Sequence, residues 1–127
     1  MAGRVKQPLG DLFGLSNFGV NMTTLEPGAI SALHHCHSKQ DEFIYILSGE
    51  AVLHIGESEE IMTPGMVMGF SAGGAAHHLE NRSTEPVTYL EIGDRTQGDV
   101  GTYPNDDLVA KHDGEKWVFE RKDGRQI

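Results

Sequence analysis

The chain contains a single cysteine, Cys36, and has no long run of apolar residues. One cysteine cannot form an intramolecular disulfide, which is compatible with a reducing compartment. The first residues, MAGRVKQPLGDLF, lack the apolar core of a signal peptide, and no run reaches the roughly 18 residues that a membrane-spanning helix needs. We therefore expect a soluble, cytoplasmic protein with no membrane partner.

Positive charge is also scarce. Ten Lys and Arg residues stand against 19 Asp and Glu residues, and the formal net charge is −9 at pH 7. Such a surface repels the phosphates of nucleic acids and of anionic lipids, so general nucleic-acid binding is not expected. The composition therefore argues against nucleic acids and membranes as partners.

The length and the turn-forming residues indicate one all-β domain. A chain of 127 residues fits a single domain, and its 16 glycines and five prolines argue for many turns and against a helical bundle. Short runs rich in β-branched and aromatic residues alternate with these turns, which is typical of an all-β sandwich or barrel. We predict strands over Phe18–Leu25, Ser31–His37, Glu42–Leu47, Ala51–Ile55, Glu60–Met62, Met66–Phe70, His77–Asn81 and Val87–Ile92.

Two further segments bear on the surface of this domain. Glu42–Leu47 is apolar on both faces after its first residue, so we expect another sheet, a terminal segment or a second subunit to cover its outer side. The residues after Gly93 are polar and turn-rich up to Asp107, and Trp117–Glu120 with the turn after it resembles a last hairpin. We interpret the acids and Tyr103 of this stretch as a solvated turn.

Histidines form two clusters, His34–His37 and His77–His78. Successive side chains of a strand point to opposite faces, so His35 and His37 share one face while His34 and Cys36 share the other. Two imidazoles on one face can bind the same ion. A His-x-His pair alone is weak evidence, however, because surface strands also carry histidines without any ligand.

Glu42 follows after a short connection, and sheet pairing could bring a histidine of the second cluster alongside. Three imidazoles and one carboxylate suit Fe(II), Mn(II), Ni(II), Cu(II) or Zn(II), with positions left for water or substrate. The expected metal ligands are His35, His37, Glu42 and His77.

The joint arrangement of these residues with glycines resembles the two sequence motifs of the cupin family. The first motif is matched by Gly28, His35, His37, Glu42 and Gly49. The second is matched by Gly65, Gly73, His77 and Asn81. The resemblance covers Leu25 to Ile92, with a short intermotif stretch from Glu50 to Pro64.

The chain departs from the cupin pattern in three places. Six residues rather than five separate Gly28 from His35, Ser71 stands where the second motif has proline, and one extra residue precedes His77. These changes leave His78 as an alternative fourth ligand. His77 is preferred because Asn81 follows it at the family's spacing.

The resemblance implies a double-stranded β-helix barrel, with the motif core at 25–92 and an extension at 93–127 that packs on the barrel or on a partner subunit. It implies a divalent metal in one open end, positive φ at Gly49 and Gly65, and a homodimer. The resemblance places five residues partly around the cavity, although residues of these types more often belong to the plain core: Tyr45, Met66, Met68, Phe70 and Tyr89.

Three classes of function fit such a barrel. The first is a metal-dependent enzyme of small polar molecules, namely a dioxygenase, isomerase or lyase. The second is a ligand-binding or sensor module without catalysis, and the third is a metal-containing structural or storage protein. Stand-alone cupins with such a short intermotif stretch are often named after sugar-phosphate isomerases on resemblance alone, which does not establish that reaction. Near the second motif only Arg82 and Arg95 are candidates for holding a phosphate.

Overall fold

A computed structural model describes residues 1–112 and 116–125 of the chain. It is an all-β domain with one short 3-10 helix, η1 (Leu9–Phe13), so the predicted fold class is confirmed. Among the described residues no helix has the length and apolar composition to cross a membrane. The strands are β1 (Arg4–Pro8), β2 (Phe18–Leu25), β3 (Cys36–His37), β4 (Glu42–Ser48), β5 (Ala51–Ile55), β6 (Ser58–Met62), β7 (Val67–Phe70), β8 (His77–Glu80), β9 (Val87–Asp94), β10 (Val100–Thr102), β11 (Val109–His112) and β12 (Trp117–Glu120).

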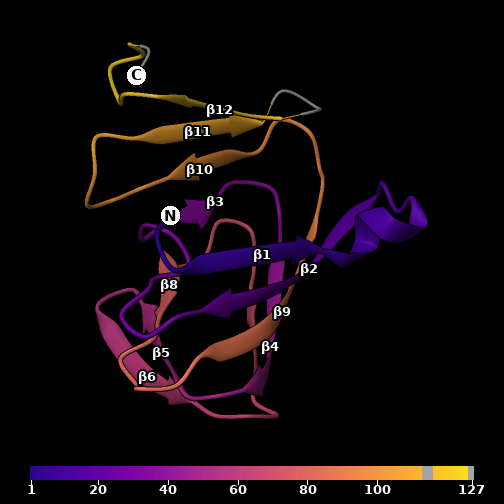
Figure 1. Ribbon diagram of the computed structural model, residues 1–127. Coiled ribbons are helices and arrows are strands. Elements are labelled where there is room, and N and C mark those ends of the chain that lie inside the picture. Colours follow the sequence, from indigo (N-terminus) through magenta and orange to yellow (C-terminus); the bar gives the residue numbers. More distant parts are fainter. Residues whose placement is uncertain (113–115, 126–127) are drawn as a thin grey trace.

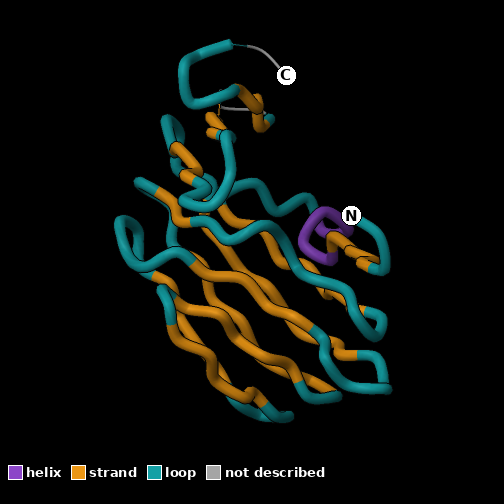
Figure 2. Tube along the Cα trace, turned by 90° about the vertical axis from the view of Figure 1, so that its left-hand side faces the viewer, coloured by secondary structure: helices purple, strands orange, loops and turns teal. Residues whose placement is uncertain are grey.

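The strands form three antiparallel sheets. A five-stranded sheet in the order β1-β2-β9-β4-β7 and a three-stranded sheet in the order β6-β5-β8 make up the barrel. The third sheet, β12-β11-β10-β3, lies at one end of the barrel, where β3 joins it to the barrel strands (Figure 1). Figure 2 shows the same arrangement from the side, with the terminal strands above the long strands of the barrel.

The hydrophobic core lies inside the barrel and follows the alternation of the strands. Ile44 and Ile46 of β4 are buried, whereas Phe43, which precedes them, and Tyr45, which lies between them, are each 39% exposed. Buried and exposed side chains therefore alternate along β4, as they do in a strand that has only one face covered. The largest fully buried apolar side chains are Tyr89, Leu25, Ile46, Leu53, Met62 and Val87.

Two glycines of the sequence motifs form turns with a left-handed backbone, as predicted. Gly49 has φ 81° and Gly65 has φ 88°. At Gly49 a Cβ atom would also collide with the backbone carbonyl oxygen of Pro86. Only glycine meets both demands at this turn without strain.

One predicted strand, over Ser31–His37, is mostly irregular. The chain advances five residues between the bridge of Ile30 with Glu80 and the bridge of His35 with His77, whereas the opposite strand advances three. The two extra residues cannot stay in the ladder, so this stretch bulges and only Cys36–His37 remains a strand.

Candidate metal centre

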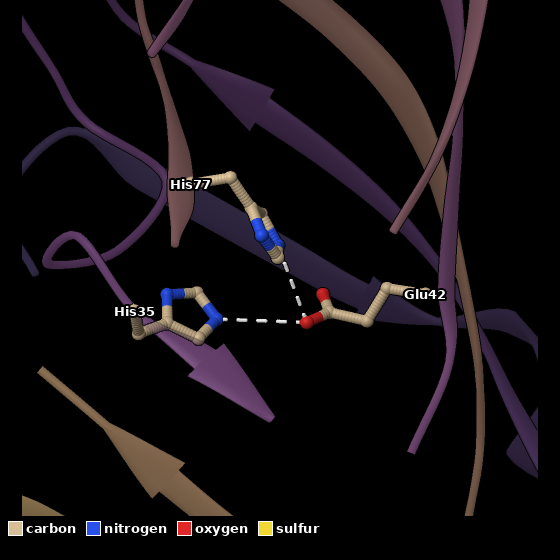
Figure 3. Close-up of side chains that lie close together, drawn as sticks. All are labelled: His35, Glu42 and His77. Carbon is tan, nitrogen blue, oxygen red and sulfur yellow. Dashed lines mark ion pairs between the residues drawn. The ribbon is translucent and has the colours of Figure 1, made fainter. Parts of the chain in front are cut away.

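Four of the predicted site residues lie together at the end of the barrel next to β3. His35 and His37 come from the end of the bulged segment and from β3, Glu42 begins β4, and His77 begins β8. Figure 3 shows His35, Glu42 and His77 pointing toward one another from three different segments of the chain. The pairing of His35 with His77 across an isolated bridge brings the two histidine clusters to the same place.

The histidine side chains converge on one carboxylate oxygen. Oε1 of Glu42 lies 3.6 Å from Nε2 of His35, 3.3 Å from Nε2 of His77 and 2.7 Å from Nε2 of His37. One ligand atom each from His35, Glu42 and His77 lies within 4.8 Å of the other two, which is close enough to hold one metal ion. Nε2 of His37 is the nearest of the three nitrogens to Oε1 of Glu42, but His37 does not belong to the group of three residues whose ligand atoms all lie within that distance.

The hydrogen bonds of the outer ring nitrogens orient all three imidazoles. Nδ1 of His35 donates to the carbonyl oxygen of Leu33 at 2.8 Å, and Nδ1 of His77 to that of Ala75 at 3.3 Å. Nδ1 of His37 donates to the carboxylate of Asp99 at 2.6 Å. With the proton on Nδ1 in each ring, the lone pairs of the three Nε2 atoms point toward Glu42.

These donor atoms fit a cation. Oε1 of Glu42 and Nε2 of His77 are buried, and neither completes a hydrogen bond of good geometry in the described residues, although imidazole nitrogens lie 2.7, 3.3 and 3.6 Å from Oε1. A buried carboxylate oxygen that faces nitrogen lone pairs is unfavourable unless a positive charge lies between them. The nitrogen and oxygen donors are those that divalent transition metals prefer.

The charges of the site keep Glu42 ionised. Burial alone would raise the pKa of Glu42, but the imidazoles of His35, His37 and His77 outweigh burial and hold the pKa well below its usual range. For His37, burial would lower the pKa, and the carboxylates of Glu42 and Asp99 outweigh it and raise the pKa. A carboxylate that is ionised at all ordinary pH values is a ready metal ligand.

Asp99 is a functional residue that the sequence analysis missed. Its side chain is 0% exposed, and one carboxylate oxygen accepts hydrogen bonds from the backbone N–H groups of Lys39 at 2.6 Å and Gln40 at 3.0 Å. The other oxygen accepts from His37. Burial would raise the pKa of Asp99, but these donors lower it, so the carboxylate is fixed beside the ring of His37.

Aromatic rings enclose the histidines. The ring of Phe70 stacks on His77 with centroids 3.6 Å apart, and the ring of Tyr103 stacks on His35 at 5.6 Å. Trp117 of β12 contacts His37 edge-on at 5.5 Å. The interpretation of Tyr103 as part of a solvated turn was therefore wrong, because β10 pairs with β3 and carries Tyr103 over the site.

The site opens into a cavity of about 1050 Å³ that is lined by strands of the barrel and by residues of η1, β11 and β12. Phe70 and Tyr89 line it, as expected, but Tyr45 and Met66 are 39% and 44% exposed and lie outside its lining. Tyr45 and Ile44 occupy adjacent positions of β4, and it is Ile44 that points inward. The parity of the strand thus corrects the expectation for Tyr45.

The floor of the cavity is polar and carries both signs of charge. Nζ of Lys6 lies 3.2 Å from Oε1 of Glu91, and Nη1 of Arg4 donates to the carbonyl oxygen of Ser31 at 2.6 Å. Tyr89 also lines the cavity, and its hydroxyl group is buried. Thr23 is the direct cross-strand partner of Tyr89, so the two buried hydroxyl groups lie close together.

Of the two arginines considered as phosphate ligands, only Arg95 lines the cavity, where it pairs with Asp11 at 3.2 Å. Arg82 instead forms exposed ion pairs with Glu59 and Glu80, each at 2.8 Å. Arg4 and Lys6 were not anticipated. They belong to β1, whose polar sequence gave no sign that it pairs with β2 at the edge of the barrel.

His78, the alternative fourth ligand, lies on the other face of β8 from His77. Its Nδ1 is 2.9 Å from Nδ1 of His34, and its ring stacks on His54. The alternation of side chains along the strand separates the two histidines, so His77 approaches Glu42 and His78 does not.

The comparisons with known proteins agree with this architecture. A family model described as "Cupin domain" matches residues 21–93. No curated protein matches the chain. The structure of a protein described as a sugar phosphate isomerase from a cupin superfamily, from Silicibacter pomeroyi, is 42% identical, with a TM-score of 0.94 over 100% of this chain and 82% of that chain.

Two other solved structures extend the comparison. A candidate sugar phosphate isomerase from Acidithiobacillus ferrooxidans is 32% identical, with a TM-score of 0.88 over 98% of this chain and 80% of that chain. The cupin domain of an XRE family transcriptional regulator from Enterobacter cloacae is 24% identical, with a TM-score of 0.60 over 75% of this chain and 99% of that chain, and shows the fold alone. Because the family model spans residues 21–93 of the 127, and the first structure is similar along the whole chain, the chain belongs to the cupin family.

Proposed function

We propose that this protein is a metal-dependent cupin that binds and acts on a small polar molecule at a site formed by His35, His37, Glu42 and His77. The observation that carries the proposal is the orientation of the three imidazoles. Each donates its Nδ1 proton outward and turns Nε2 toward the carboxylate of Glu42. Such a buried set of lone pairs is suited to one divalent cation.

These four residues would hold a divalent ion beside the cavity, and such an ion would supply Lewis-acid chemistry for the oxygen atoms of the small molecule. The chain itself contributes a hydroxyl group above the site. Burial, and to a lesser degree the charge of Glu42, raises the pKa of Tyr103, so this phenol stays protonated and can donate a hydrogen bond to a bound oxygen.

The cavity below the site selects for polar ligands. The hydroxyl group of Tyr89, in the lining of the cavity, favours a molecule with oxygen atoms that can hydrogen-bond to it. The ammonium group of Lys6 and the guanidinium group of Arg4 favour one that carries an anionic group. A small, oxygen-rich and anionic compound satisfies both.

The metal content of the purified protein tests the proposal. We expect one tightly bound divalent ion per chain at this site, and His35→Ala weakens its binding by at least about tenfold because one of the few ligands is lost. Cys36→Ser is the matched control, since its side chain belongs to the neighbouring position and approaches the carbonyl oxygen of Thr102 instead. If His35→Ala and Cys36→Ser bind the ion as the wild type does, the proposal fails.

Sugar-phosphate isomerisation is a second candidate reaction. It is favoured by the similarity to the proteins from Silicibacter pomeroyi and Acidithiobacillus ferrooxidans, which are described as sugar phosphate isomerases, together with Arg4 and Lys6 in the cavity. A panel of aldose and ketose phosphates, followed for interconversion, tests it. Lys6→Gln should raise KM for a phosphorylated substrate. Tight binding of a sugar phosphate without turnover would instead assign a binding module.

A further inference from the structure

A second group of histidines lies on the outer face of the small sheet, away from the candidate metal centre. Direct pairing places His78 of β8 opposite His54 of β5, and His54 opposite Glu59 of β6. His34, from the bulged segment, lies beside His78 at the end of this row. The row therefore crosses the sheet β6-β5-β8, which forms the lower part of the barrel in Figure 1.

Two nitrogen atoms of this row are close enough to share one ion. Nδ1 of His34 and Nδ1 of His78 are 2.9 Å apart, so that one ring donates a hydrogen bond to the other, and an ion would take the place of the shared proton. The rings meet edge to face with an interplanar angle of 86°. Two nitrogens at this separation, each about 2.0 Å from a metal, subtend an angle of about 90° at it. That angle belongs to neighbouring positions of square-planar or octahedral coordination, which Cu(II) and Ni(II) adopt.

The surroundings hold the ring of His78 in place. The imidazole of His54 stacks on it with centroids 4.3 Å apart and an interplanar angle of 7°. Nε2 of His54 is itself 2.8 Å from Oε1 of Glu80, and Glu80 and Glu59 are both bound by Arg82. The stack limits the movement of His78, and the half-buried pair stays open to solvent on its outer side.

We propose that His34 and His78 form a second metal site, which takes Cu(II) or Ni(II) through their two Nδ1 atoms, with water in the remaining positions. His54 is a positioning residue that holds the ring of His78 and does not bind the ion. The site goes beyond the proposed function, because it uses none of the ligands of the candidate metal centre and faces the opposite side of β8.

Titration with Cu2+ against a chromophoric chelator tests this site by counting the ions bound per chain. We expect His34→Ala and His78→Phe each to bind one ion fewer than the wild type. His54→Phe is the matched control, because phenylalanine keeps a flat ring against His78, and it should retain that ion with affinity within about threefold. Far-UV circular dichroism verifies that each variant is folded.

The outcomes for the two sites are distinguishable. His35→Ala removes the ion of the candidate metal centre and leaves the ion at His34 and His78, whereas His34→Ala does the reverse. If the candidate metal centre binds nothing, His34→Ala still lowers the count by one. Equal Cu2+ binding by the wild type, His34→Ala and His78→Phe would overturn the second site.

A spectroscopic measurement on the wild type tests the second metal site without requiring that any variant folds. Electron paramagnetic resonance of the ion bound at the outer site should show hyperfine coupling to imidazole nitrogen. For this measurement Cu2+ is added to one equivalent and then to two, so that the tighter site fills first, and the difference between the two spectra gives the signal of the second ion. A Cu2+ spectrum without nitrogen coupling would overturn the proposal.

Discussion

At the scale of single residues, Asp99 decides which nitrogen of His37 carries the proton. One of its carboxylate oxygens is committed to the backbone N–H groups of Lys39 and Gln40, and the other accepts from Nδ1 of His37. A buried carboxylate in this position fixes the tautomer that presents Nε2 to a metal. We regard Asp99 as part of the candidate metal centre although it does not point at the ion.

Asp99→Asn should therefore weaken metal binding by about 10- to 100-fold. The two backbone donors hold the amide oxygen, so the NH2 group faces His37 and the proton of the ring moves to Nε2, where it blocks coordination. Titration calorimetry with the metal found in the native protein measures the effect. Asp123→Asn, in an exposed pair with Arg125, is the control. Unchanged affinity in Asp99→Asn would show that the tautomer of His37 does not matter.

Tyr103 offers a second prediction at the residue scale. Its phenol ring stacks on His35, and its hydroxyl group is the part proposed to contact the bound molecule. Tyr103→Phe keeps the ring, so we expect metal affinity within about twofold of the wild type and a loss of about 1 kcal/mol in ligand binding, the usual net contribution of one hydrogen bond. Parallel titrations with metal and with ligand separate the two effects. A Tyr103→Phe variant that loses the metal would contradict this role.

At the scale of secondary-structure elements, the turn after β4 depends on Gly49. Both Gly49 and Gly65 have positive φ, but only a side chain at Gly49 meets neighbouring atoms, namely the carbonyl oxygen of Pro86 and, at 2.9 Å, Cα of Val87. Gly65→Ala should cost about 1 kcal/mol of unfolding free energy for the backbone conformation alone.

Gly49→Ala should cost clearly more, about 3 kcal/mol, since the collision adds to the same backbone strain. Urea denaturation of the two variants beside the wild type measures both values. Equal losses in the two variants would mean that the turn relaxes around Pro86 without cost.

The elements that alternate regularly could be predicted from the sequence. β2 and β5 have the predicted bounds, because apolar and polar residues alternate there and turn residues flank them. β1 escaped prediction, since RVKQP has little apolar character and becomes a strand only by pairing with β2 at the sheet edge. The bulge at 31–35 depends on its register with β8, which the sequence does not display.

The residues of the candidate metal centre could likewise be predicted only in part from the sequence. The spacing of His35, His37 and Glu42 and the resemblance to a family motif indicated the residues that the structure brings together. Asp99 and Tyr103 could not be found in this way. They reach the site only because β10 pairs with β3, a contact between segments more than 60 residues apart in the chain.

At the scale of the whole molecule, the outer face of the five-stranded sheet is apolar and uncovered in the single chain. Phe43, Tyr45 and Leu47 of β4 are 39%, 39% and 41% exposed, and Val67 of the neighbouring strand is 49% exposed. The terminal strands lie at the end of the barrel and not over this face (Figure 1). The predicted homodimer would cover such a patch.

We expect the protein to be a dimer in solution and Tyr45→Lys to shift it to a monomer, because a charge would be buried at the centre of the patch. Sedimentation velocity at micromolar concentration gives the mass of each form. Leu12→Lys is the control, as Leu12 is 76% exposed on η1 outside the sheet. A wild type that sediments as a monomer would contradict the homodimer.

The central claim is that the barrel holds one divalent ion between the three imidazoles and the carboxylate of Glu42. The most direct test is anomalous diffraction from crystals grown with one equivalent of Mn2+. The account predicts one anomalous peak bonded to Nε2 of His35, His37 and His77 and to the carboxylate of Glu42. Crystals with no peak between these side chains, or with manganese bound only elsewhere on the chain, would contradict it.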